Sequence, residues 1–191
     1  MKLIVGLGNP EERYTGTRHN LGFDVLDELV KKLNLVDWTV EDKFKAELIK
    51  TPELILVKPK TFVNLSGMSV KSLTTYYKIA PEDVVIINEE LDLPLGKIKV
   101  RLGGAAAGHH GVESVIKELG TDQFIRVRLG IGNLKTQSAE HKKGHVSAEK
   151  FVLEPFLHQE KSTVKHMIKQ SLKALEVLLE KGLEQAQNQF N

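Results

Sequence analysis

Short apolar runs recur along the chain and predict the strands of a sheet. Residues 3–5 and 84–88 are apolar almost throughout, as expected for strands that are buried on both faces. The run at 84–88 is the most apolar of the chain, so we expect it at the centre of the sheet. Residues 46–50 and 53–59 flank a Thr-Pro pair, and they predict two strands joined by a tight turn.

Two further segments, KIKVRL at 97–102 and FIRVRLGI at 124–131, alternate basic and apolar side chains. Successive side chains of a strand point to opposite faces of a sheet. Each segment therefore predicts a strand with one apolar face and one charged face.

Apolar residues that recur every three or four positions predict helices between these strands. We expect Asn20 to cap the first helix and Pro81 to end the second. The predicted helices cover residues 21–33, 64–80, 111–120 and 160–186.

Strands that alternate with helices predict one α/β domain over residues 1–191, with a twisted mixed β-sheet flanked by helices on both faces. A long C-terminal helix at 160–186 completes it. Residues 132–148 are polar, basic and without periodicity, so they predict a mobile loop.

Composition narrows the class of protein. Hydrophobic residues make up 41% and charged residues 27% of the 191 positions, which is ordinary for a globular domain. The chain has no cysteine, which excludes disulfides, thiol nucleophiles and cysteine zinc sites. No apolar run is long enough to span a membrane, and the apolar start is too short for a signal peptide. We therefore expect a cytoplasmic protein that has no membrane partner.

The formal net charge is only +2, but its distribution is uneven. Residues 97–143 contain nine lysine and arginine residues against four acidic residues. Such a surface is able to hold a polyanion. On charge alone, an ordinary solvated face is the more common explanation.

Polar side chains follow four of the predicted strands. Open α/β sheets place their binding sites at the carboxyl ends of their strands. Taken singly, each group has a structural explanation, such as a turn-forming asparagine or a structural histidine. The four groups are Asn9 with His19, Phe62 with Asn64, Glu89, and His109 with His110.

A histidine with an acid to orient it, and amides to polarise a carbonyl, suits ester hydrolysis. The chain has no G-x-S-x-G nucleophile elbow and no cysteine. The base would therefore have to activate water directly.

The same residues do not favour a cofactor or a metal. GLGNP lacks the third glycine of a dinucleotide fingerprint. His109 and His110 are adjacent and cannot easily share one ion, while His141 and His145 lie in a lysine-rich segment without acids to complete a site. We predict no cofactor and no metal.

Taken together, these stretches resemble the bacterial-type peptidyl-tRNA hydrolases. The resemblance covers nearly the whole chain in order. The matching segments are IVGLGNP (4–10), Tyr14, TRHNLGF (17–23), KTFVNLSG (60–67), ELDLPLGKIKVR (90–101), GG…GHHG (103–111), LGTDQFIRVRLGIG (119–132) and FVL (151–153).

The resemblance implies a monomeric α/β enzyme with no metal, cofactor or obligate protein partner. Its substrate would be peptidyl-tRNA, whose peptide is joined by an ester to the tRNA 3′ end. By motif, His19 would be the general base and Glu89 the acid that orients it. Asn9 would recognise the peptide bond, and Asn64 would position substrate and water.

The remaining roles that the resemblance implies concern the RNA. Tyr14 and Phe62 would line the site near the terminal adenosine. The basic side chains that would bind phosphates of the acceptor stem are Lys99, Arg101 and Arg128. Such contacts hold RNA by its shape and backbone, with little reading of sequence.

Three positions depart from the family pattern inside the expected site. Glu89 stands where the family usually has Asp, Val63 where it has Met, and His110 where it has Asn. We expect His110 to contact substrate, near Glu89, and His109 to pack at a helix start. The departures leave three alternatives: a re-fitted hydrolase, a slow or shifted enzyme, or a tRNA- or RNA-binding relative without hydrolysis.

Overall fold

The computed structural model describes residues 1–132 and 147–191, so most of the loop predicted at 132–148 lies outside the described residues. Within them, seven strands form one mixed sheet in the order β2-β3-β4-β1-β5-β7-β6. The pairs β1–β4, β1–β5 and β5–β7 are parallel, whereas β2–β3, β3–β4 and β6–β7 are antiparallel. The predicted mixed sheet is confirmed.

The strands are β1 (Lys2–Gly6), β2 (Thr39–Glu41), β3 (Ala46–Lys50), β4 (Leu54–Pro59), β5 (Val84–Glu90), β6 (Ile98–Leu102) and β7 (Ile125–Gly130). The helices are α1 (Leu21–Lys32), α2 (Ser66–Tyr77), α3 (His110–Leu119), α5 (Ala148–Val152), α6 (Lys161–Lys181) and α7 (Leu183–Phe190). None of these helices is both long and apolar enough to cross a membrane.

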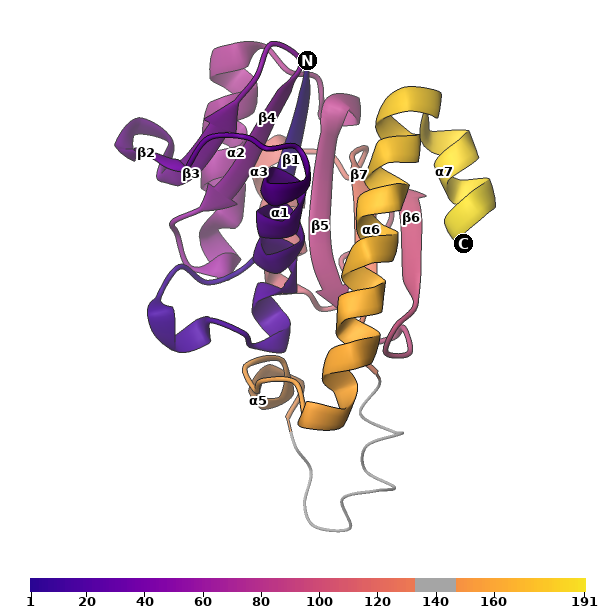
Figure 1. The fold of residues 1–191 in the computed structure, drawn as a ribbon. Coiled ribbons are helices and arrows are strands. Elements are labelled where there is room, and N and C mark those ends of the chain that lie inside the picture. Colours follow the sequence, from indigo (N-terminus) through magenta and orange to yellow (C-terminus); the bar gives the residue numbers. More distant parts are fainter. Residues whose placement is uncertain (133–146) are drawn as a thin grey trace.

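Helices cover both faces of the sheet, with α1 and α6 on one side and α2 and α3 on the other (Figure 1). Alternate residues of the central strands enter different cores. Ile4 of β1 packs in the core beneath α1 and α6, while Val5 packs in the core beneath α2 and α3. The apolar runs of these strands are continuous because both of their faces are buried.

The prediction of one apolar face and one charged face holds for both β6 and β7, but the basic side chains of β7 are largely buried. Lys99 and Arg101 of β6 are exposed, but Arg126 of β7 is only 1% exposed. The Arg126 guanidinium donates hydrogen bonds of 2.8–3.1 Å to the carbonyl oxygens of Gly103, Gly104 and Ala105, so the chain after β6 folds over it. Alternation therefore marked the two faces correctly but did not show that the basic face is covered.

The helix predicted over 160–186 is wrong in its extent. It ends at Lys181, and Gly182, with φ of 86°, begins a second helix, α7. The last residue, Asn191, accepts a hydrogen bond from the Val100 backbone N–H (2.7 Å) and donates one to its carbonyl (2.9 Å). The chain end thereby satisfies backbone groups on β6, which is the last strand of the sheet.

Asp24 of α1 is a half-buried acid with no hydrogen bond or ion pair among the described residues. Burial, followed by repulsion from Asp27, raises its pKa to about 6, although Lys58 partly opposes the shift. The ionised form of this side chain is therefore poorly accommodated at neutral pH.

Replacing Asp24 with asparagine is expected to raise the free energy of unfolding by about 1 kcal/mol at pH 8, after allowance for solvent screening. The folded-state pKa lies above the ordinary value of 3.8, so the Asp24 contribution is complete below about pH 4 and is lost as pH rises through about 6. Urea unfolding of both proteins at pH 4 and pH 8 measures the difference. An equal gain at both pH values would contradict this explanation.

Candidate active site

The candidate site is a cavity of about 320 Å³ that lies where β1 and β5 end and α3 begins. Residues from six separate segments line it, including Asn9, His19, Asn64, Glu89 and His109. Parallel strands bring their carboxyl ends to one edge of a sheet, which explains why residues so far apart in sequence meet here. The expectation that these strand ends converge is confirmed for the residues just named.

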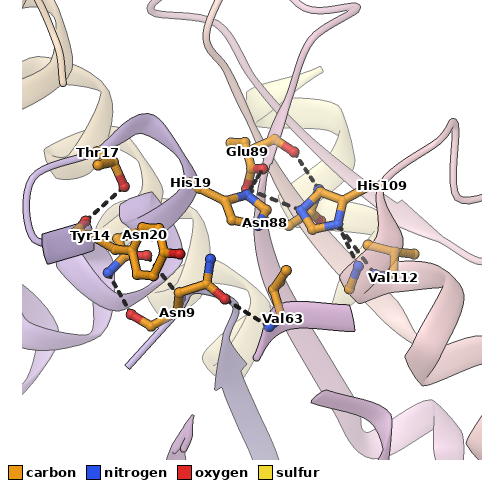
Figure 2. Close-up of polar contacts among 11 residues, drawn as sticks. Asn9, Tyr14, Thr17, His19, Asn20, Val63, Asn88, Glu89, His109 and Val112 are labelled. Atoms are coloured by element: carbon orange, nitrogen blue, oxygen red, sulfur yellow. Dashed lines mark hydrogen bonds and ion pairs between the residues drawn. The ribbon is translucent and has the colours of Figure 1, made fainter. Parts of the chain in front are cut away.

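His19 is buried in a short 3-10 turn, Arg18–Asn20, directly before α1. Its Nδ1 atom forms a close hydrogen bond with Oε1 of Glu89 (Figure 2). An ionised carboxylate only accepts hydrogen bonds, so Nδ1 carries the proton. The lone pair of His19 is then on Nε2, which is the arrangement that a general base requires.

Glu89 is 3% exposed, and each of its carboxylate oxygens accepts a hydrogen bond from a histidine. Oε2 lies 3.1 Å from Nε2 of His109, while Oε1 is bound to His19. Burial by itself acts to raise the pKa of this carboxyl, but His109 and His19 lower it by more, so the net shift is downward. Glu89 is therefore a buried anion held between two imidazole rings.

His109 has a larger role than the packing residue expected from the sequence. It is the N-cap of α3, and its Nδ1 accepts hydrogen bonds from the backbone N–H groups of Gly111 (3.1 Å) and Val112 (3.3 Å). The proton of the neutral ring must then be on Nε2, where it is donated to Glu89. The helix predicted at 111–120 has His110 directly before it, so nothing in the sequence indicated that His109 is the capping residue.

Burial lowers the pKa of His109 and Glu89 raises it, with a net upward shift. An added proton would have to go to Nδ1, which already accepts two backbone N–H groups at the start of α3. Protonation would replace this cap by a repulsive contact. We therefore assign the neutral form to His109, with the proton on Nε2.

The donor atoms of His19, Glu89 and His109 lie within 4.8 Å of one another, a grouping that is able in principle to hold a metal ion. The tautomer of His109 opposes this use. A metal at Nε2 would need the lone pair there, and the proton would move to Nδ1 against the helix N–H groups. The three residues fit proton transfer better than metal binding.

The Asn9 side chain has a fixed orientation. Its Oδ1 accepts a hydrogen bond from the Val63 backbone N–H (2.9 Å), so the amide NH₂ group is the end left for a ligand (Figure 2). The sequence predicted that Asn20 caps α1, but its side chain makes no capping hydrogen bond to this helix. It binds the backbone of Asn9 instead, accepting from N–H (2.9 Å) and donating to the carbonyl (3.0 Å).

The remaining predicted contact residues lie around this centre. Asn64 lines the cavity and is exposed, and Phe62 beside it is 50% exposed. Tyr14 is half-buried beneath the Arg13 guanidinium, 4.8 Å from its ring centroid. His110 lines the cavity, but its Nδ1 lies 3.0 Å from Glu113, and the histidine bound to Glu89 is His109.

The three predicted phosphate contacts share one face of the β6–β7 pair, where Lys99 is opposite Arg128. Lys99 and Arg101 are exposed, whereas the Arg128 side chain is only 14% exposed. Arg128 donates from Nε (3.0 Å) and Nη2 (2.9 Å) to Oε2 of Glu90. An RNA phosphate would therefore reach Lys99 and Arg101 directly but would compete with Glu90 for Arg128.

Arg18, next to His19, is a further buried side chain that the sequence did not single out. It donates to the carbonyl of Pro155 (2.8 Å) and to Glu160 (2.9 Å), and it stacks on the Phe151 ring at 4.2 Å. These contacts tie the turn that carries His19 to the segment that links α5 to α6. That segment begins beside the wall of the cavity formed by α5.

Comparisons with known proteins agree with one another. The family model described as Peptidyl-tRNA hydrolase matches residues 3–191. Peptidyl-tRNA hydrolase of Bacillus cytotoxicus is 43% identical over 195 residues, covering 100% of both chains. That of Thermodesulfovibrio yellowstonii is 37% identical, covering 100% of this chain and 99% of its own. The crystal structure of peptidyl-tRNA hydrolase from Acinetobacter baumannii superposes with a TM-score of 0.86 at 32% identity, covering 100% of this chain and 94% of that one.

Proposed function

Because the chain belongs to the peptidyl-tRNA hydrolase family and is an enzyme that hydrolyses peptidyl-tRNA, we propose that His19 activates the attacking water. The hydrogen bond between buried Glu89 and Nδ1 of His19 is the observation that carries this proposal. It leaves Nε2 unprotonated and stabilises the positive ring that forms when the base takes a proton.

Glu89 has this effect because it is held in place from its other side. The Nε2–H group of His109 donates to Oε2, and the ring of His109 is itself fixed by the first backbone N–H groups of α3. Orientation of the acid therefore derives from a helix start rather than from a flexible surface group. Misplacement by about 1 Å is sufficient to cost roughly a hundredfold in rate, so this support matters.

The amides complete the reaction centre. The NH₂ group of Asn9 donates to the carbonyl of the peptide bond next to the ester, which distinguishes a peptide from a free amino acid. Asn64 positions substrate and water, and His110 contacts the substrate at the rim. Tyr14 and Phe62 offer aromatic rings to the terminal adenosine.

The proposed reaction follows from these positions. Nε2 of His19 takes a proton as water oxygen bonds to the ester carbonyl carbon. The tetrahedral intermediate then breaks the bond to the ribose 3′ oxygen, and His19 returns the proton to that oxygen. The products are a peptide acid and a tRNA with a free 3′ hydroxyl, and no covalent enzyme intermediate is formed.

We propose that the tRNA backbone binds the exposed basic side chains of β6, Lys99 and Arg101. Arg128 would join them when a phosphate displaces Glu90 from its guanidinium. The acceptor stem would be held by charge and shape. We propose that a monomer carries out this reaction in the cytoplasm, without an obligate protein partner.

Hydrolysis of N-acetyl-aminoacyl-tRNA in ¹⁸O-enriched water tests the proposed chemistry. Attack by water on the acyl carbon is expected to place the label in the carboxylate of the released amino acid and none in the tRNA. A relative that only binds RNA would bind tRNA with a steep salt dependence and release nothing at any enzyme concentration. That outcome, or label in the tRNA, would sink the proposal.

A further inference from the structure

A second cavity, of about 220 Å³, adjoins the catalytic cavity and shares Asn9 with it. The turn after β1, the first two turns of α1 and the end of β4 enclose this second cavity. A third cavity, between α1 and α6, shares Thr15, Asp24 and Asp27 with the second. The three cavities thus adjoin one another in series from the catalytic centre to the groove between two helices.

The acids around the second cavity all have a cationic partner within the described residues, apart from Asp24. Asp24 lies in the wall common to the second and third cavities and makes no hydrogen bond or ion pair there. The paired acids are Glu11 with Arg13 (2.9 Å), Glu47 with Lys60 (3.8 Å), and Asp27 with Lys58.

The basic side chains of β6 and the second cavity lie on different sides of the sheet. Ile98 and Val100 pack in the core beneath α1 and α6, so Lys99 and Arg101 point to the opposite face. The second and third cavities are built partly from α1, on the first face. If the RNA is held by the basic side chains of β6, the α1 side of the sheet is left for the peptide.

We propose that the peptide of peptidyl-tRNA leaves the catalytic cavity over Asn9 and places one upstream side chain in the second cavity, where a lysine or arginine pairs with Asp24. Residues farther upstream enter the groove between α1 and α6, whose floor includes Val164, Ile168 and Leu172. This selectivity rests on the function proposed above, because the peptide must be attached at the His19 centre.

The electrostatics of the second cavity favour a cationic side chain. Burial and then the neighbouring Asp27 raise the pKa of Asp24 to about 6, and Lys58 opposes the shift only in part. Lys58 is already bound to Asp27 and stacked 4.7 Å from the Trp38 ring centroid. A cationic group of the peptide would supply the missing partner, whereas an acidic side chain would add to the repulsion.

Acetylated alanine-rich tetrapeptidyl-tRNAs test this route, with lysine or glutamate at the second, third or fourth residue from the ester. Each kcat/KM is divided by that of N-acetyl-alanyl-tRNA, which is too short to reach the second cavity and cancels effects on RNA binding. At one position, lysine is expected to be preferred over glutamate by about three- to fivefold. Asp24→Asn is expected to remove most of that preference.

Asp42→Asn is the matched control, since Asp42 is an exposed aspartate that lines none of the three cavities. It removes the same charge and is expected to keep the preference. Equal rates for lysine and glutamate at all three positions, a preference that persists in Asp24→Asn, or its loss in Asp42→Asn would each overturn the proposal. Failure of the proposed function is distinguishable, because N-acetyl-alanyl-tRNA itself would then not be hydrolysed.

Discussion

Replacing His19 with alanine is expected to lower kcat for N-acetyl-aminoacyl-tRNA hydrolysis by about 10³-fold, within the range that general-base catalysis supplies. The ring is buried against Glu89. The other two histidines of the cavity are poor substitutes, because both ring nitrogens of His109 are held in hydrogen bonds and His110 is bound to Glu113 at the surface. KM is expected to change little, because the tRNA is held elsewhere. Steady-state rates over a range of substrate concentrations separate the two constants.

His166→Ala is the control for this variant, because His166 is an exposed histidine of α6 and lies outside the cavity. It is expected to retain the wild-type kcat. Circular dichroism would confirm that both variants are folded. Equal kcat values for His19→Ala and wild type would rule out His19 as the base.

Replacing Glu89 with glutamine is expected to lower kcat by about 10³-fold through the tautomer of His19. Glutamine keeps the shape of the side chain but offers one oxygen and one NH₂ group to two histidines that both donate. If the NH₂ group faces His19, Nδ1 becomes the acceptor and Nε2 carries the proton. The base is then blocked without any loss of volume.

The pH dependence supplies a second readout for the same carboxyl. Because both histidines lower the pKa of Glu89, it stays ionised through the acid limb of the activity profile. Glu89 should therefore add no titration of its own to the acid limb, which reflects the site histidines alone. A profile that requires a carboxyl titration near pH 4 to 5 would contradict the assignment.

Glu89→Asp and His110→Asn restore the residues that the family usually carries. Measured singly and together, they test whether the side chains at 89 and 110 interact. His110 is bound to Glu113 and is 60% exposed, whereas His109 contacts Glu89. The effects of the two substitutions on kcat are therefore expected to add. A large coupling energy between them would show that His110 reaches Glu89 in the working enzyme.

The elements of the fold were largely predictable because hydrophobic periodicity reports burial directly. The 84–88 run became β5, which is buried along its whole length, and residues 21–33 became α1. The failures have a common cause. Gly182 breaks the last helix and the chain after β6 covers Arg126, and both depend on packing between segments distant in sequence.

The site was predictable as a set of residues but not as an arrangement. Asn9, His19, Asn64, Glu89 and His110 were expected together, and all line one cavity. Two neighbouring histidines with the same flanking glycines gave no means of deciding which one meets the acid. Only the start of α3, which holds Nδ1 of His109, turns Nε2 toward Glu89 and leaves His110 at the surface.

The sequence by itself determined the α/β class, the family and the chemical groups available, since these follow from residue type, spacing and order along the chain. The tertiary structure decided which atoms face each other. It put both oxygens of Glu89 on histidines and fixed the oxygen of the Asn9 amide on the Val63 N–H group, which leaves the NH₂ end for a ligand. It also left Asp24 without a hydrogen bond or ion pair among the described residues. Proton positions and unpaired charges depend on distances of a few ångströms between remote segments, and a linear pattern does not carry that information.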